Sequence, residues 1–308
     1  MNNPLAVMDL GTNTFHLLIV EGSSSDFKEI VHEQVAVKLG EGGINQGVIQ
    51  PAAFERGIKT MQSFNILISK NKVQKVRAIA TSALRSAANG QDFIDEVKVQ
   101  TGIAIEIIDG DEEAAYIYKG VKAGGCLSHP NSLIVDIGGG SVEFIICDNK
   151  HIRWKQSFEI GAARLMDTFH RTDPIPPESI TALNLYLEDC LKDLFDAASR
   201  YTIENIIGSS GVFESYASVI ELAKGNLFDL KKTNYYTFDQ DELLALIEKL
   251  VRSTHQDRLV TKGIIPIRVD MIVVASLLTR FVIQKLGINK VVMTTNSLKE
   301  GMLTEMMG

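Results

Sequence analysis

The chain has 308 residues, of which 45% are hydrophobic and 22% charged, as expected of a globular protein of about two domains. Its formal net charge of −7 argues against a broad cationic surface for nucleic acid or for a membrane. No run of about 18 apolar residues predicts a membrane span, and the first residues lack the pattern of a signal peptide, so we expect a cytoplasmic protein.

The first part of the chain predicts alternating strands and helices. Strands at residues 5–8 and 15–20 flank a turn, and a third extended run covers 31–37. They are followed by a helix at 51–69, a strand at 76–81, a helix at 90–100 and a strand at 103–108. This mixed α/β order predicts an N-terminal lobe over residues 1–124.

After a loop with the sequence "GGCLSHPN", the order begins again with a strand, a glycine turn and a strand. Two later helices are indicated by apolar positions that share one face. These positions are Ile180, Leu183, Leu187, Leu191 and Leu194 in the first helix, and Leu243, Leu244, Ile247, Leu250 and Val251 in the second. Residues 125–308 are therefore predicted to form a C-terminal lobe.

The two lobes begin with related sequences. Placing "VMDLGTNTFHLLIV" over "IVDIGGGSVEFIIC" aligns Asp9 with Asp136, Gly11 with Gly138 and Thr14 with Ser141. A repeated hairpin of this kind predicts two similar lobes that face each other. The cleft between them is the expected site.

Both hairpin turns have the composition of a phosphate-binding loop. Glycine lacks Cβ, so the backbone can adopt positive φ and an anion can approach the backbone N–H groups closely, while hydroxyl groups add donors. The candidate phosphate ligands are Gly11, Thr12, Asn13, Thr14, Gly138, Gly139, Gly140 and Ser141. The alternative is that the glycines only make tight hairpins, but the matched pair of turns favours binding.

The acidic residues beside the turns suggest a metal ion. Asp9 or Asp136 would repel phosphate unless a divalent cation lay between them, and hard oxygen ligands favour Mg²⁺, with Mn²⁺ as an alternative. Glu143 lies across the second hairpin from Asp136. We expect Asp136 and Glu143 to bind the metal, with Asp9 as a weaker candidate.

Six segments together resemble a known family. They are "DLGTNTFHLLI", "ATSALRSAANG", "IEIIDGDEEAAYIYKGV", "IVDIGGGSVEF", "GSSG" and "NSLKEGML". Their order and spacing resemble those of the exopolyphosphatase and guanosine pentaphosphate phosphatase family, within the actin-like ATPase and sugar kinase superfamily. The resemblance implies a two-lobed ribonuclease-H-like fold with a cleft between the lobes. It also implies Mg²⁺-dependent hydrolysis of terminal phosphoanhydrides in polyphosphate or guanosine pentaphosphate, and it leaves a homodimer open.

The stretch "DGDEEAAY" contains the predicted catalytic base. If Asp109 caps a helix, Glu112 falls at the third helical position and completes a capping box, a structural role. Glu113 projects about 100° further round the helix and is free to face the cleft. The resemblance assigns catalysis to the second glutamate of the pair, which is Glu113.

Basic residues are needed to hold phosphate. Arg85 matches an arginine of the family that resembles a phosphate ligand, and a guanidinium grips phosphate oxygens in pairs. For Arg164, Arg268 and Lys38, phosphate contacts and surface ion pairs stay equally open. Ala115 stands where the family often has an arginine, so one contact is absent.

Other sequence features have structural explanations. His16 takes the place of Glu143 in the first hairpin, and its apolar flanks favour a hydrogen-bonded structural histidine. Ser297 and Glu300 form a capping box for the last predicted helix, which we expect to cross back to the first lobe.

Two other functions stay open. A phosphotransferase of the sugar or acetate kinase type would need an acceptor pocket and an adenosine site, and the sequence identifies neither. The "GSSG" turn before a helix fits a phosphate or nucleotide contact and a simple chain reversal equally well. A noncatalytic regulator that binds alarmone or polyphosphate is the third hypothesis, which the intact acidic residues disfavour.

Overall fold

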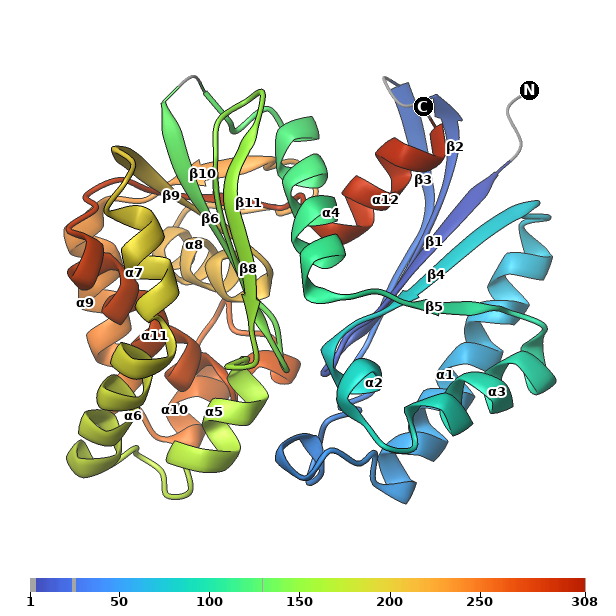
Figure 1. Ribbon diagram of the computed structural model, residues 1–308, viewed down its shortest axis with the longest axis horizontal. Coiled ribbons are helices and arrows are strands. Elements are labelled where there is room, and N and C mark those ends of the chain that lie inside the picture. Colours follow the sequence, from blue (N-terminus) through green and yellow to red (C-terminus); the bar gives the residue numbers. More distant parts are fainter. Residues whose placement is uncertain (1–3, 24–25, 129, 308) are drawn as a thin grey trace.

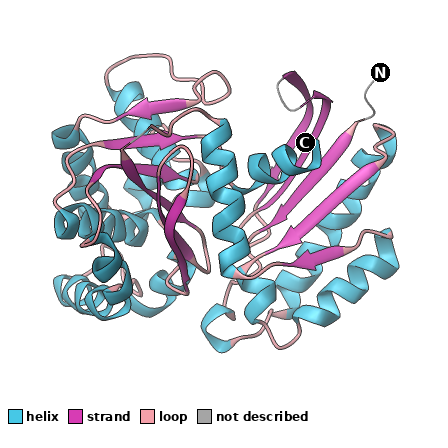
Figure 2. Ribbon diagram, turned by 45° about the horizontal axis from the view of Figure 1, so that its top comes forward, coloured by secondary structure: helices cyan, strands magenta, loops and turns pink. Residues whose placement is uncertain are grey.

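Two β-sheets face each other with helices between them and on their outer sides (Figure 1). The computed structural model describes residues 4–23, 26–128 and 130–307. Figure 2 shows the same layers from a second direction, with the first sheet and its helices on the right and the larger second sheet on the left. Within the described residues, no helix is both long enough and apolar enough to cross a lipid bilayer.

The first sheet has the strand order β3-β2-β1-β4-β5. These strands are β1 (Leu5–Leu10), β2 (Phe15–Ser23), β3 (Asp26–Val35), β4 (Lys75–Ala80) and β5 (Ile105–Ile107). β2 pairs antiparallel with both β1 and β3, while β4 pairs parallel with β1 and β5 pairs parallel with β4. The predicted strand at 31–37 begins earlier and ends sooner, because β3 extends the hairpin with β2 along nearly its whole length.

The second sheet repeats this topology and adds one edge strand. Its order is β10-β11-β9-β6-β7-β8, and β8-β7-β6-β9-β11 corresponds to the complete first sheet. The strands are β6 (Asn131–Ile137), β7 (Val142–Cys147), β8 (Ile152–Phe158), β9 (Ile203–Ser209), β10 (Tyr235–Thr237) and β11 (Val291–Thr294). This duplicated topology confirms the predicted two-lobed ribonuclease-H-like fold.

The register of the two hairpins is the same. Asp9 pairs with His16 across β1 and β2, and Asp136 pairs with Glu143 across β6 and β7. Each aspartate is the next-to-last residue of its strand. Both carboxylates are therefore delivered to the same place relative to their turns.

Three helices cover the outer face of the first sheet. They are α1 (Pro51–Lys70), α2 (Ser82–Ser86) and α3 (Gly90–Thr101), with the short 3₁₀ helix η1 (Ile44–Gln46) before them. Phe93 of α3 contacts Phe15 of β2 and Phe54 of α1 edge-on, with ring centroids 6.2 and 5.1 Å away. These aromatic contacts join the helices to the sheet in one core.

The outer side of the second sheet carries more helices. They are α5 (Ala162–Phe169), α6 (Pro177–Cys190), α7 (Lys192–Ala198), α8 (Gly211–Ala223), α9 (Gln240–Arg252), α10 (His255–Val260) and α11 (Ile272–Leu286), with the 3₁₀ helix η2 (Pro266–Arg268) before α11. The helix predicted through Leu194 divides at Leu191, whose backbone (φ −96°, ψ 16°) is not helical. Leu183, Leu187 and Leu194 still point into one core.

Helices α4 (Gly110–Ala123) and α12 (Leu298–Met307) lie between the two sheets (Figure 1). They touch closely, because a Cβ added to Gly120 would lie 1.9 Å from the Ser297 carbonyl oxygen, and one added to Gly301 would lie 1.9 Å from that of Tyr116. Their apolar side chains join a core that includes Val7 of the first sheet and residues of the second.

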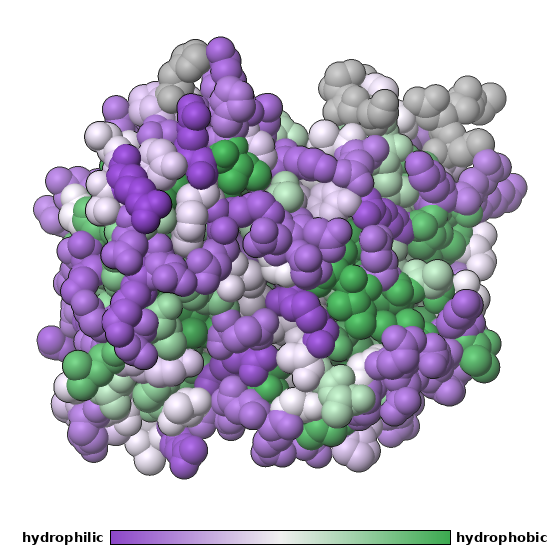
Figure 3. Space-filling view, viewed as in Figure 1, coloured by the Kyte–Doolittle hydropathy of each residue, from purple (hydrophilic) through white to green (hydrophobic). Residues whose placement is uncertain are grey.

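The predicted boundary between residues 124 and 125 falls at the end of α4. The first sheet precedes it and the second follows it, while α12 returns to contact α4 and β1. The division into independently folding domains stays a prediction. The face seen in Figure 3 is largely hydrophilic over the second lobe and has an apolar area in its right half.

Candidate active site

A cavity of about 560 Å³ lies between the two hairpin turns. It is lined by residues from both lobes, from the start of α4 and from the start of α12. Twelve residues proposed from the sequence line it, namely Asp9, Gly11, Thr12, Asn13, Thr14, Glu113, Asp136, Gly138, Gly139, Gly140, Ser141 and Glu143. The repeat and the family motifs therefore converge on one place.

The two turns are closed by equivalent hydrogen bonds. The Gly11 N–H donates to the Thr14 carbonyl at 3.0 Å, and the Gly138 N–H donates to the Ser141 carbonyl at 3.0 Å. None of the glycines in these turns adopts the positive φ that glycine permits. Close contact between the lobes requires glycine instead, since a Cβ on Gly140 would lie 2.6 Å from Thr12 Oγ1.

Three carboxylates face the cavity from the hairpins, of which Asp136 and Glu143 are buried and Asp9 is partly exposed. Burial raises the pKa of Asp9 to about 7, although Lys299 opposes the rise. Burial raises the pKa of Asp136 to about 6, against a 2.8 Å hydrogen bond from Ser209 Oγ. Burial and the neighbouring Asp136 raise the pKa of Glu143 to about 8. Nearby positive charges therefore do not fully offset the effect of burial on these three carboxylates.

This shortage of positive charge fits a divalent cation. Among the residues that the structure describes, no three His, Cys, Asp or Glu side chains form a complete ligand set. Mg²⁺ does not require one, because it retains several waters and usually takes one or two carboxylates together with substrate phosphates. Asp136 and Glu143, paired across one hairpin, suit that mode of binding.

Glu113 lies in the first turn of α4, in the wall of the cavity. The predicted capping box is present: Asp109 Oδ1 accepts from the Glu112 N–H at 2.8 Å, and Glu112 Oε2 accepts from the Asp109 N–H at 3.1 Å. Glu113 takes no part in the cap and is only 7% exposed. Burial and the charge of Glu143 raise its pKa well above the ordinary value, while Arg85 opposes them.

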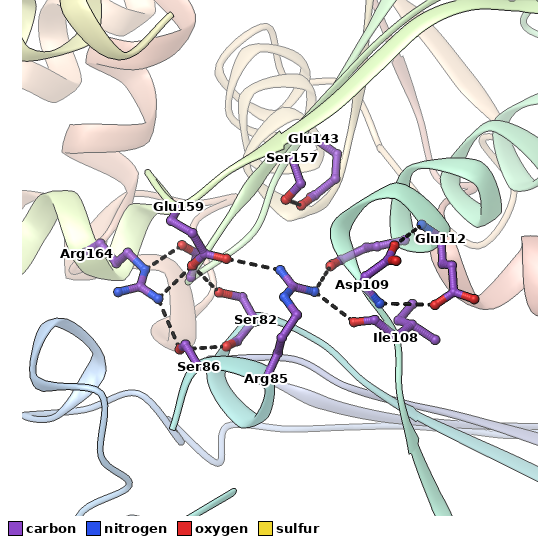
Figure 4. Close-up of polar contacts among 12 residues, drawn as sticks. Ser82, Arg85, Ser86, Ile108, Asp109, Glu112, Glu143, Ser157, Glu159 and Arg164 are labelled. Carbon is purple, nitrogen blue, oxygen red and sulfur yellow. Dashed lines mark hydrogen bonds and ion pairs between the residues drawn. The ribbon is translucent and has the colours of Figure 1, made fainter. Parts of the chain in front are cut away.

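Arg85 lies behind Glu113 and does not line the cavity. Its Nη1 donates to Glu113 Oε2 at 3.1 Å and to the Ile108 carbonyl at 3.0 Å, and its Nη2 donates to Glu159 Oε1 at 3.2 Å. Figure 4 shows the guanidinium between Glu159 on one side and Ile108 on the other. Its predicted contact with substrate phosphate requires one of these acceptors to be exchanged.

The three other basic candidates form ion pairs. Arg268 lines the cavity and donates to Glu214 Oε2 at 2.6 Å. Lys38 lies 3.4 Å from Asp270 of the other lobe. Arg164 pairs with Glu159 Oε2 at 2.6 Å, and its Nε donates to the Gly140 carbonyl of the second turn at 2.9 Å.

His16 lines the cavity beside the first hairpin. Its Nδ1 is buried and has no hydrogen-bond partner among the described residues, so the expected hydrogen bond is not found at this atom. Burial, together with Lys299, lowers its pKa well below the ordinary value. The imidazole is therefore neutral at physiological pH.

Sequence reasoning missed Lys299 in the first turn of α12. This side chain lines the cavity and lies 3.2 Å from Glu300, whose Oε2 accepts the Ser297 N–H at 2.7 Å. Burial acts to lower the Lys299 pKa, but Glu300, Glu214 and Asp9 outweigh it and keep the pKa above its ordinary value. The sequence did contain a signal for this residue. A lysine in the first turn of a helix is disfavoured by the helix dipole, so its presence there suggests another role.

The two ribonuclease-H-like sheets and the cavity between their hairpins define a protein of the two-lobed, actin-like class. The model of the Ppx/GppA phosphatase family matches residues 18–308, and the chain belongs to that family. It is thus a hydrolase.

Individual relatives agree with this assignment. The chain is 38% identical to an exopolyphosphatase from Cytophaga hutchinsonii, with a TM-score of 0.96 over 99% of this chain and 98% of that one. A Ppx/GppA family member from Aquifex aeolicus is similar in fold, with a TM-score of 0.81 over 99% and 98% of the two chains at 22% identity.

A curated relative from Photobacterium profundum is named guanosine-5'-triphosphate,3'-diphosphate pyrophosphatase. It is 27% identical, and the alignment covers 98% of this chain but only 59% of that protein. The chain therefore spans less than two thirds of the length of this relative.

Proposed function

We propose that this hydrolase releases orthophosphate from the terminal phosphoanhydride of inorganic polyphosphate, with guanosine pentaphosphate as a second candidate substrate. The observation that carries the proposal is the position of Glu113: a buried carboxylate, held by Arg85, in the wall of a cavity lined by two glycine turns. A water beside this carboxylate can be aimed at a phosphorus held by the turns.

The reaction needs a water in line with the leaving phosphate, and its catalysis comes mainly from positioning and charge stabilisation. The residues of the two turns would hold the phosphates through N–H and hydroxyl groups. Glu113 orients the water and accepts its proton. Because burial and Glu143 raise the pKa of Glu113, its carboxylate is a stronger proton acceptor than an exposed glutamate.

Asp136 and Glu143 would hold Mg²⁺, or Mn²⁺ in its place, with Asp9 as a further ligand. When bound, the ion neutralises charge on the phosphate oxygens and so permits polyanion and carboxylates to share the cavity. Lys299 supports the same balance from the start of α12, since its charge acts on Asp9 and Asp136.

The two candidate substrates are supported by different relatives. The 38% identical structure is that of an exopolyphosphatase, and the 27% identical curated relative is named guanosine-5'-triphosphate,3'-diphosphate pyrophosphatase. Both substrates end in a phosphoanhydride, so the groups described here serve either one. Cytoplasmic location and homodimer formation stay predictions.

The test is phosphate release from polyphosphate and from guanosine pentaphosphate in parallel, with Mg²⁺, with Mn²⁺ and with EDTA. We expect metal-dependent release, with the larger kcat/KM for polyphosphate. Release that requires an added acceptor would support a phosphotransferase instead, and binding of either compound without release would support a regulator.

A further inference from the structure

A second cluster of charged side chains adjoins the cavity, where α2 of the first lobe meets the end of β8 and α5 of the second. Its centre is Glu159, between Arg85 and Arg164 in Figure 4. The Glu159 carboxylate accepts hydrogen bonds from Ser82 Oγ at 2.8 Å, Arg85 Nη2 at 3.2 Å and Arg164 Nη2 at 2.6 Å. Two guanidinium groups and one hydroxyl from both lobes thus converge on one carboxylate.

Both arginines have anchors other than Glu159. Arg85 Nη1 is bound to the Ile108 carbonyl at 3.0 Å. Arg164 Nε and Nη1 donate to the carbonyls of Gly140 at 2.9 Å and Ile44 at 2.8 Å. Because these bonds fix the guanidinium planes, the donors that now contact Glu159 would stay in place if its carboxylate moved away.

Glu159 is the most exposed member of the cluster. Its side chain is 48% exposed, compared with 20% for Arg85 and 15% for Arg164. Exposed ion pairs contribute little to stability because water solvates the separated charges well. Replacement of this carboxylate by another anion should therefore require little free energy, whereas moving either arginine into solvent should require more.

The donors suit a phosphate group. Guanidinium forks bind carboxylate and phosphate oxygens with the same geometry, and a phosphate offers more acceptor oxygens and more charge than a carboxylate. The cluster also borders the reaction site, since Arg85 contacts Glu113 and Arg164 contacts Gly140, two residues of the cavity wall.

Arg85 is already expected to contact phosphate from the family resemblance. We propose that Ser82 and Arg164 complete a phosphate subsite with it, and that Glu159 occupies this subsite as an internal substitute while no phosphate is bound. A phosphate group that reaches the subsite displaces the Glu159 carboxylate, which moves into solvent. This inference rests on the proposed function, because it assumes that the protein handles phosphate. The phosphate belongs either to the substrate chain or to the released product.

The test measures binding of inorganic phosphate to the full chain by isothermal titration calorimetry, without any hydrolysis. Glu159→Gln keeps the size and one acceptor oxygen but removes the competing charge. We expect it to bind phosphate about 5-fold more tightly than the unmodified protein, the effect of losing one half-exposed charged competitor.

The matched control is Glu188→Gln. Glu188 has the same 48% exposure and pairs with Lys285 at 2.6 Å in the second lobe, outside the cluster. We expect no change in phosphate affinity from this variant. In the double variant Glu159→Gln with Arg164→Gln, the gain should disappear, because one of the two guanidinium groups is missing.

Two results would overturn the proposal. One is an affinity of Glu159→Gln equal to that of Glu188→Gln, with only the unfolding temperature altered, which would make Glu159 a contact between lobes. The other is a gain in phosphate affinity that persists without Arg164.

Enzyme kinetics then separate the two possible sources of the bound phosphate. A lower KM for tripolyphosphate in Glu159→Gln indicates substrate phosphate, and a lower inhibition constant for orthophosphate alone indicates product. Absence of hydrolysis would reject the proposed function but leave the binding result intact.

Discussion

Glu113 is placed between charges of opposite sign. Glu143 raises its pKa and Arg85 lowers it, while burial of the carboxylate is the largest influence. Glu113 is thus a poorly solvated carboxylate that is held by a hydrogen bond from Arg85. A glutamine at this position could still accept the hydrogen bond from Arg85 through its amide oxygen, but it could not accept a proton from water. Glu113→Gln therefore separates the structural role of the side chain from its proposed chemical role.

Replacement of Glu113 by Gln should therefore lower kcat by about 10²- to 10⁴-fold, the usual contribution of a general base. The unfolding temperature should change little. The measurement is phosphate release from polyphosphate at saturating Mg²⁺. Glu112→Gln is the matched control: it alters only the helix cap, so full activity is expected. A fully active Glu113→Gln enzyme would show that another group activates the water.

Lys299 is the cation that acts on the carboxylates of both hairpins, as its effects on Asp9 and Asp136 indicate. Lys299→Met should reduce kcat/KM about 10-fold, because phosphate then meets the same acids without this positive charge. Lys299→Arg should keep most activity. Lys122→Met, at an exposed position of α4, should have no effect. Equal activity of Lys299→Met and the unmodified enzyme would show that Lys299 does not contribute to substrate binding or turnover.

At the scale of elements, the sequence predicted the hairpins well and the distant contacts poorly. The repeated turns were found because hairpin residues are neighbours in sequence, and Glu113 was found because helix caps follow local spacing rules. Lys299 was missed because the carboxylates it acts on, Asp9 and Asp136, are far away in sequence. The contacts of Arg85 with Glu113 and Glu159 are also between distant residues, and no local pattern shows them. Periodicity also failed to show that α6 ends at Leu191, since the apolar face continues through the break.

The crossing of α4 and α12 gives a prediction about stability. Gly301→Ala should lower the free energy of unfolding by about 1–3 kcal/mol, because its Cβ would meet the Tyr116 carbonyl oxygen and the helices would have to separate. Ala123→Leu adds atoms at an exposed position of α4, so its effect should be within about 0.5 kcal/mol. Chemical denaturation measures both. Equal stabilities would mean that the helices separate without cost.

For the whole molecule, the buried acids connect stability with pH. The pKa values of Asp9, Asp136 and Glu143 are raised to about 7, 6 and 8 in the folded chain. These three acids therefore bind more protons in the folded state than in the unfolded state, and their contribution to stability falls as pH rises from about 4 to about 8. The lowered pKa values of His16 and His170 act in the opposite direction but involve fewer groups. A bound cation favours the charged forms and should reverse this trend.

Without divalent metal, we thus expect the unfolding temperature to fall between pH 5 and pH 8. Added Mg²⁺ should raise it more at pH 8 than at pH 5. Thermal unfolding in EDTA and in Mg²⁺ at both pH values provides the measurement. Glu143→Gln should weaken the pH dependence and the metal effect together. An equal response to Mg²⁺ at both pH values would argue against these carboxylates as ligands.

The duplicated lobes are alike in topology but not in chemistry. Asp9 faces His16 where Asp136 faces Glu143, and α12 follows β11 as α4 follows β5. Counted from the residue before each helix, Glu113 corresponds to Gly301 and Asp111 to Lys299. The likeness of the two lobes is therefore lost at the cavity, where Glu113 lies at the start of one helix and Lys299 at the start of the other. On the proposed function, either end of a linear phosphate chain can be the reacting one, so the position of Glu113 decides from which side of the cleft the rest of the chain extends.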